Sequence, residues 1–285
     1  MQTTPNTKHK TQNTYRVAII GAGIAGLTLA YRAATAGHQV TLYEANTIAS
    51  GASGQSLGIL VPVTGLNRPI DLLQRQGIAQ WPALAQQLAT ETTTPLPTFF
   101  RDWQNGRYQL NTALIFPLLA QAIRQKGGVI HENHPITNLA NIRNQTDHTI
   151  LTAGYGNAAL TGAPITISAG LAARFTGDIE GLIAQDNLFL CPSFTAGEVL
   201  AGSVNWSLQE PHHGAIPPAK QAELLRRVHA IAPHLKLQEI WLGNRPTQTP
   251  RTPLLTSPEP MLHIVTALGK IGLGLAPAIP LPLAN

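Results

Sequence analysis

Residues 15–44 read YRVAIIGAGIAGLTLAYRAATAGHQVTLYE, and this stretch decides the fold of the chain. Its first six residues form a short β-branched run, which is typical of a strand that is buried on both faces. A G-x-G-x-x-G run at 21–26 leads into residues 27–36, which favour a helix closed by Gly37. Residues 39–43 then predict a second strand. The stretch therefore predicts a strand–helix–strand unit with a glycine-rich turn after its first strand.

Four residues of this unit have the properties that dinucleotide binding requires. Gly21 allows the tight turn, Gly23 lets a pyrophosphate approach the backbone, and Gly26 lets the helix pack on the strand. The helix N-terminus offers free N–H groups and a partial positive charge to the phosphates. Glu44 follows Gly21 by 23 positions and can accept hydrogen bonds from an adenosine ribose, while its charge disfavours the 2′-phosphate of NADP.

The segment after the second strand distinguishes a flavin from a nicotinamide cofactor. Residues 48–60 read IASGASGQSLGIL, a loop of small residues, where a nicotinamide dehydrogenase normally continues into another helix. Such an unencumbered backbone suits close packing against an extended flavin and its pyrophosphate. With this loop, the sequence resembles the FAD-dependent amino-acid oxidase superfamily, which includes D-amino acid oxidase, glycine oxidase and sarcosine oxidase. The resemblance implies an α/β fold in which a Rossmann-type FAD-binding domain is interleaved with a smaller antiparallel-sheet substrate domain.

The resemblance continues in patches along the rest of the chain. Residues 116–128 predict a helix, residues 131–139 an edge strand along the adenine, and residues 149–156 a strand and turn beside the FAD. The substrate-covering sheet is expected at 167–177, 188–193 and 198–203, followed by a helix at 217–232. We therefore expect a disordered tail at 1–14, an FAD-binding domain at 15–66, 112–162 and 240–285, and a substrate domain at 67–111 and 163–239.

Two C-terminal segments resemble motifs of the superfamily. Residues 241–255, WLGNRPTQTPRTPLL, are similar to G-x-R-P-x-T-x-D-x-x-P, and residues 266–278, TALGKIGLGLAPA, to a closing G-x-x-x-G-x-x-x-A-P. In relatives the closing segment begins a helix whose N-terminus points at the flavin and stabilises the negative charge of its reduced form. Pro277, Pro280 and Pro282 predict that the chain leaves helical form early.

The motifs and the resemblance together assign a set of residues to FAD, bound without a covalent link. They are Gly21, Ala22, Gly23, Ile24, Ala25, Gly26, Glu44, Ala45, Gly51, Ala52, Ser53, Gly54, Gly58, Ile136, Ala153, Gly154, Gly269, Ile271 and Gly272.

The superfamily resemblance implies oxidation of a small amine or amino acid, by hydride transfer from the α-carbon to the flavin N5. An arginine fork suits a substrate carboxylate, because it binds both oxygens and keeps its charge. Arg245, in the GNRP match, is the first candidate for this role, and the alternative is a structural arginine that binds loop carbonyls. Arg251 stands where the family usually has Asp, and Lys270 is either a cation near the flavin or an exposed lysine.

Composition limits the class of protein and its partners. With 44% hydrophobic and 12% charged residues, the chain can bury a core without metal or disulfides, and it contains one cysteine, Cys191. The net charge of +5 is scattered, which argues against a nucleic-acid partner. His131 and His134 have metal-like spacing, but a strand would place them on opposite faces, so no metal site is expected. Residues 1–14 are polar and resemble neither a signal nor an anchor, so a cytoplasmic location without a transmembrane segment is expected.

The sequence leaves several functional alternatives open. We expect a small amine or amino acid as substrate and O₂ or another electron acceptor as oxidant, and a homo-oligomer is compatible with the sequence. Compared with the family that it resembles, we expect the chain to be shortened around 103–112 and at the C-terminus, which would affect turnover more than FAD binding. Two alternatives therefore remain: an FAD oxidase that acts on carboxymethylaminomethyl-uridine in tRNA, and a catalytically silent FAD-binding protein.

Overall fold

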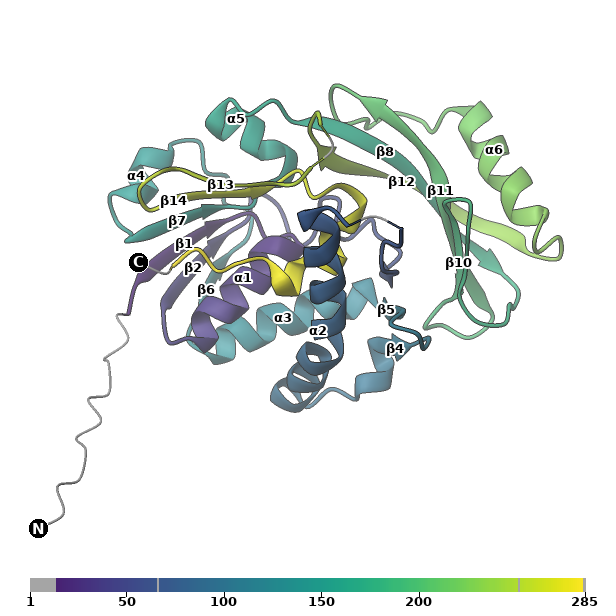
Figure 1. The fold of residues 1–285 in the computed structure, drawn as a ribbon, viewed down its shortest axis with the longest axis horizontal. Helices are drawn as coiled ribbons and strands as arrows, with labels where there is room; N and C mark the ends of the chain where they lie inside the picture. Colours follow the sequence, from purple (N-terminus) through teal and green to yellow (C-terminus); the bar gives the residue numbers. More distant parts are fainter. Residues whose placement is uncertain (1–13, 66, 251, 284–285) are drawn as a thin grey trace, which may run out of the picture.

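The computed structural model describes residues 14–65, 67–250 and 252–283, and three sheets organise these residues (Figure 1). The first sheet has six strands in the order β13-β14-β7-β1-β2-β6. Their bounds are β1 (Arg16–Ile20), β2 (Gln39–Tyr43), β6 (Val129–His131), β7 (His148–Leu151), β13 (Leu254–Glu259) and β14 (Leu262–Thr266). All neighbouring pairs are parallel except β13 with β14. The carboxyl ends of the parallel strands therefore meet at one edge, where open α/β sheets bind ligands.

Helices on one side of this sheet form the main core with it. They are α1 (Ile24–Thr35), α2 (Pro69–Thr92) and α3 (Thr112–Gln125), and the short α7 (Gly272–Leu275) packs against α2. Helices α1 and α3 lie on the strands, and α2 packs on α3. Buried side chains from all three long helices, such as Leu29, Trp81 and Leu119, join one hydrophobic cluster with β1 and β2. At Gly77, a Cβ would overlap the carbonyl oxygen of Gly274, so this glycine lets α2 approach α7 closely.

The second sheet is antiparallel, with five strands in the order β12-β8-β11-β10-β9. Its strands are β8 (Thr166–Thr176), β9 (Ile183–Gln185), β10 (Leu188–Pro192), β11 (Glu198–Leu208) and β12 (Lys236–Thr247). Helix α6 (Pro218–His229) covers its outer face, as Figure 1 shows, and buries Leu224 and Val228 against Phe175 and Val199. The opposite face of this sheet faces the six-stranded sheet. This arrangement confirms the expected α/β fold with a separate antiparallel sheet.

Three short strands, one before α2 and two after it, form a third, small sheet with the order β3-β5-β4. Its strands are β3 (Ile59–Leu60), β4 (Phe100–Asp102) and β5 (Tyr108–Leu110), preceded by the short helix η1 (Leu96–Thr98). Phe99, Phe100 and Leu110 join the main core with α2. The domain division stays a prediction, and this packing favours counting residues 69–110 with the FAD-binding part of the chain.

The remaining elements are short. They are α4 (Leu139–Arg143), η2 (Gly154–Gly156), α5 (Asn157–Thr161), η3 (Gly269–Ile271) and η4 (Ala276–Ala278). The closing helix α7 has four residues and η4 ends before Ile279, which confirms that the chain leaves helical form early. The predicted edge strand at 131–139 is wrong: β6 ends at His131, and Asn133 takes a left-handed conformation with φ 54°. The predicted tail at 1–14 lies outside the described residues except for its last position.

No helix among the described residues is long and apolar enough to cross a membrane.

Candidate active site

A cavity of about 1180 Å³ lies between the six-stranded and five-stranded sheets. The carboxyl ends of the parallel strands form one wall, through Ile20, Tyr43, Thr152 and Thr266. Strands β8, β11 and β12 form the opposite wall. The cavity therefore combines the ligand-binding edge of an α/β sheet with a covering antiparallel sheet.

The glycine-rich turn brings backbone directly to this cavity. At Gly21 (φ 107°), a Cβ would lie 2.6 Å from the Cα of Ala153, and at Gly26 it would overlap the carbonyl oxygen of Gly21. These two glycines therefore let β1, β7 and α1 approach one another. Gly23 lines the cavity, and the hydroxyl of Ser53, at 3.1 Å, is the one atom from a non-neighbouring described residue within 4 Å of its absent Cβ. Position 23 is thus open to a ligand, as a pyrophosphate at a helix N-terminus needs.

Glu44 connects the end of β2 to this turn. Its carboxylate accepts hydrogen bonds from the backbone N–H of Ala22 at 2.7 Å and of Asn46 at 3.0 Å. A carboxylate offers about four acceptor positions, so two remain for other donors. Glu44 also lines the cavity, where these positions can accept two ribose hydroxyls.

The small-residue loop after β2 lies between the two sheets. The hydroxyl of Ser53 accepts a hydrogen bond from the backbone N–H of Ile24 at 3.0 Å, which joins the loop to the first turn of α1. The indole N–H of Trp241 on β12 donates to the carbonyl of Gln55 at 3.0 Å. The loop is thereby held by both walls of the cavity.

Most of the residues assigned to FAD from the sequence line the cavity. They are Gly21, Gly23, Ile24, Ala25, Glu44, Ala45, Gly51, Ala52, Ser53, Ile136, Ala153, Gly154, Gly269, Ile271 and Gly272.

Four others, Ala22, Gly26, Gly54 and Gly58, lie behind the lining residues. A Cβ at Gly54 would overlap the carbonyl of Ala49, and one at Gly58 the carbonyl of Leu110. These glycines therefore serve close chain packing.

His131 and His134 do not lie on opposite faces, as the strand pattern predicted. Both rings pack against Tyr43, with centroid distances of 5.3 Å, and their own centroids are 5.6 Å apart. The strand ends at His131, and the turn that follows brings His134 back to the same side. The described residues contain no group of three or more His, Cys, Asp or Glu side chains that could hold a metal ion.

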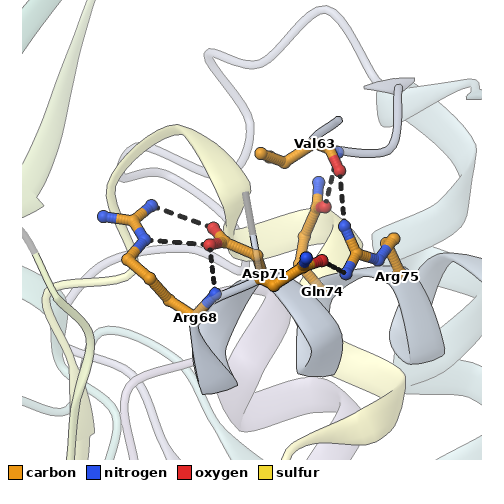
Figure 2. A network of polar contacts seen from close by, with 6 residues as sticks. Val63, Arg68, Asp71, Gln74 and Arg75 are labelled. Atoms are coloured by element: carbon orange, nitrogen blue, oxygen red, sulfur yellow. Dashed lines mark hydrogen bonds and ion pairs between the residues drawn. The ribbon is translucent and has the colours of Figure 1, made fainter. Parts of the chain in front are cut away.

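Residues 61–64 form another part of the wall, and α2 holds them in place (Figure 2). The side-chain amide of Gln74 donates to the carbonyl of Val61 at 3.1 Å and accepts from the N–H of Val63 at 3.0 Å. Arg75 donates to the carbonyl of Val63 at 3.0 Å. At the start of α2, the guanidinium of Arg68 donates to the carboxylate of Asp71 at 2.8 Å, and this hydrogen bond lowers the pKa of Asp71. The wall segment is thus fixed to a helix that is anchored at its first turn.

Two cations line the end of the cavity formed by the antiparallel sheet and η3. Arg245 is partly buried and donates to the Oδ1 of Asn205 at 2.5 Å, and burial lowers its pKa. Lys270 is exposed, and its ammonium lies 3.4 Å from the Oδ1 of Asn187. Both cations thus contact neutral amides. Arg251 lies outside the described residues.

The charged side chains that line the cavity differ between its two ends. Among the described lining residues, Glu44 is the one carboxylate, and it lies at the end of β2, away from Arg245 on β12. Cys191 does not line the cavity: it is fully buried, and its sulfur accepts a hydrogen bond from Gln109 at 3.2 Å. This placement agrees with a flavin that has no link to Cys191.

Comparison with known proteins assigns the chain to a family. Residues 16–103 and 90–280 match the model of the FAD dependent oxidoreductase family. The matched ranges cover most of the chain, so this protein belongs to that family and binds FAD as its cofactor.

Individual relatives agree with this assignment. The glycine oxidase of Geobacillus kaustophilus is 35% identical over 80 residues, which are 27% of this chain and 21% of that protein. Its crystal structure has a TM-score of 0.77 at 18% identity and covers 93% of this chain and 92% of that chain. Iminodiacetate oxidase from Chelativorans sp. BNC1 has a TM-score of 0.73 at 18% identity, with 93% of each chain covered. The structural likeness establishes the shared fold.

The sequence interpretation missed two features of this site. The role of Gln74 could have been found from the sequence. It lies on the buried stripe of α2 with Ile78, Trp81 and Ala85, where a polar residue needs a hydrogen-bond partner. The role of Asn205 could not have been found in this way, since the orientation of its side chain depends on an irregularity in β11 that no local pattern reveals.

Proposed function

We propose that this oxidoreductase oxidises a small amine or amino acid that carries a carboxylate, such as glycine, sarcosine or a D-amino acid. The observation that carries the proposal is Arg245, a partly buried cation that lines the cavity without an acidic partner among the described residues. A buried charge is costly unless a counter-charge is present, so this site favours an anionic group on the ligand.

The cofactor end of the cavity supports the same proposal. Bound FAD would supply the hydride acceptor for the α-carbon of the substrate, at the flavin N5. Gly23 and the first turn of α1 are available to the pyrophosphate, and Glu44 to the ribose. The backbone at Gly269–Gly272, which includes Lys270, lines the cavity and is our candidate for the contact with the flavin ring system.

In this proposal the protein contributes binding and orientation. Arg245 holds the carboxylate, and this fixes the α-carbon relative to the cofactor. The two sheets provide walls on two sides of the reacting atoms. The amine is deprotonated by solvent before it binds, so the chain needs no acid or base to begin the reaction.

The visible spectrum of the purified protein tests the proposal. A yellow protein is expected to lose its flavin absorbance when glycine, sarcosine or a D-amino acid is added without oxygen. Bleaching only by tRNA that contains carboxymethylaminomethyl-uridine would replace the proposal with tRNA modification. A flavin that no amine reduces would contradict catalysis altogether.

Replacement of Arg245 tests the carboxylate assignment separately. Arg245→Ala should raise KM by about tenfold to hundredfold, because a charge-assisted hydrogen bond is lost, and should leave the oxidised flavin spectrum unchanged. Arg245→Lys keeps the charge without the bidentate geometry and should have an intermediate effect. Unchanged KM in Arg245→Ala would overturn this assignment.

A further inference from the structure

The side chain of Arg245 lies along the face of the antiparallel sheet, across its strands, instead of pointing straight out of it. Arg245 is on β12, and its guanidinium reaches Asn205 on β11, two strands away. Strand β8 lies between them, and its Gly170 is paired with Gly243 on one side and with Asn205 on the other. The arginine therefore lies diagonally over Gly170.

Gly170 makes this path available. A Cβ at this position would overlap the guanidinium of Arg245 and would lie 2.7 Å from the Oδ1 of Asn205. The backbone of β8 here has no positive φ, so conformational freedom is not the reason for a glycine. The absent side chain is needed because Arg245 and Asn205 meet above it.

A β-bulge in β11 directs Asn205 toward the cavity. Val199, Ala201 and Val204 pack in the hydrophobic cluster that α6 covers, although strict alternation from Ala201 would place position 204 on the opposite face. The register shifts between Ser203 and Asn205, and Val204 has φ 55°. The extra residue reverses the alternation, so Asn205 lines the cavity. Bulges near binding sites commonly re-aim a side chain in this way.

The chemistry of this pair leaves one amide group available. A guanidinium can only donate hydrogen bonds, so the atom of Asn205 that contacts it is the oxygen. The amide nitrogen, with two N–H donors, makes no hydrogen bond to another described residue. The guanidinium and this nitrogen together present only donors, which is the arrangement that a carboxylate requires.

We propose that Asn205 is a positioning and specificity residue of the anion site. Its oxygen holds the guanidinium of Arg245 over Gly170, and its amide N–H donates to the carboxylate of the substrate. This rests on the proposed function, in which Arg245 binds that carboxylate. It implies that Asn205 makes the site select amines that carry a carboxylate over amines that do not.

Ligand titration of the FAD-loaded protein tests the proposal without turnover. Acetate is the carboxylate probe and acetamide its uncharged match, with the change in flavin absorbance as the readout. Asn205→Ala should weaken acetate binding about tenfold, since a hydrogen bond to a charged group is lost. Asn205→Asp should weaken it about a hundredfold, because the new carboxylate neutralises Arg245 and repels the ligand. Acetamide binding, FAD content and the melting temperature should change little.

Two further variants control the experiment. Asn138→Asp adds the same charge at an exposed position outside the cavity, where the side chain only accepts a hydrogen bond, and should bind acetate as the wild type does. Gly170→Ala displaces the guanidinium directly and should weaken acetate binding as strongly as Arg245→Ala.

The outcomes separate this inference from the proposed function. If Asn205→Asp loses affinity for acetate and for acetamide equally, Asn205 has a merely structural role and the proposal is overturned. Unchanged acetate binding would also overturn it. If Asn205→Asp loses affinity for acetate alone, and no amine reduces the flavin of the wild type, the anion site is supported and the oxidase activity is contradicted. If Arg245→Ala also binds acetate normally, the anion site itself is wrong.

Discussion

Glu44 accepts a hydrogen bond from the backbone N–H of Ala22 at 2.7 Å, and this contact joins the end of β2 to the glycine-rich turn after β1. The same carboxylate lines the cavity. One side chain therefore fixes the turn and is available to the cofactor.

Replacement of Glu44 should weaken FAD binding more than it weakens the fold. Glu44→Ala removes a charged acceptor and is expected to raise the Kd for FAD by about tenfold or more. Glu44→Gln keeps one carbonyl oxygen and should have a smaller effect. Titration of the apoprotein with FAD, followed by flavin fluorescence, measures both. Equal affinities in the wild type and Glu44→Ala would contradict this role.

Gln74 is expected to stabilise the cavity wall at residues 61–64. Gln74→Leu leaves the carbonyl of Val61 and the N–H of Val63 without their partner, at a cost of about 1 kcal/mol because both residues are half-buried. We expect a lower melting temperature and faster FAD loss on dilution. Gln76→Leu, at an exposed position of the same helix, is the matched control. If the two variants behave alike, the wall does not depend on Gln74.

Acid should destabilise the protein through a buried histidine pair. The Nδ1 of His148 and the Nε2 of His263 are hydrogen-bonded at 3.1 Å. Burial is the main cause that lowers the pKa of each. At His148, Asp147 opposes this shift and His38 adds to it, and at His263 the neighbouring His148 adds to it. The pair also contacts the ring of Tyr15 and the hydroxyl of Ser257.

Because the folded state binds protons less readily than the unfolded state, the free energy of unfolding should fall as the pH drops below about 6.5. Thermal unfolding from pH 8 to pH 5 measures this slope. His263→Gln should flatten it, whereas His213→Gln, at an exposed histidine, should not. A slope that is the same in all three proteins would exclude the pair as its cause.

Cys191 should not react in the native protein. Burial raises the pKa of its thiol to about 12, and the sulfur is held beside Gln109. At pH 8 the thiol is then protonated, whereas the thiolate is the reactive form. A disulfide reagent should label the protein only after denaturant is added. Rapid labelling of the folded protein would show that this core opens readily.

Local sequence predicted much of the cofactor side of the site. The strand at 16–20 and the strand at 39–43 were each readable from short-range patterns, and so was Glu44 at the end of β2. The helix between them was also predicted, but it begins at Ile24, within the glycine-rich run, instead of at residue 27. The strand at 131–139 was wrong because a left-handed residue at Asn133 ends strand geometry there. Nothing in the neighbouring residues required that conformation.

The sequence by itself thus determined the strand–helix–strand unit, its glycine turn and the early end of the C-terminal helix. These depend on backbone sterics and on side-chain periodicity within a few residues. The tertiary structure decided which side chains meet in the cavity. Arg245 and Asn205 are 40 positions apart in the sequence. They meet because a bulge reverses the alternation of β11 and because Gly170 has no side chain on β8, the strand between them. Such a contact depends on the register of three strands, which no local pattern encodes.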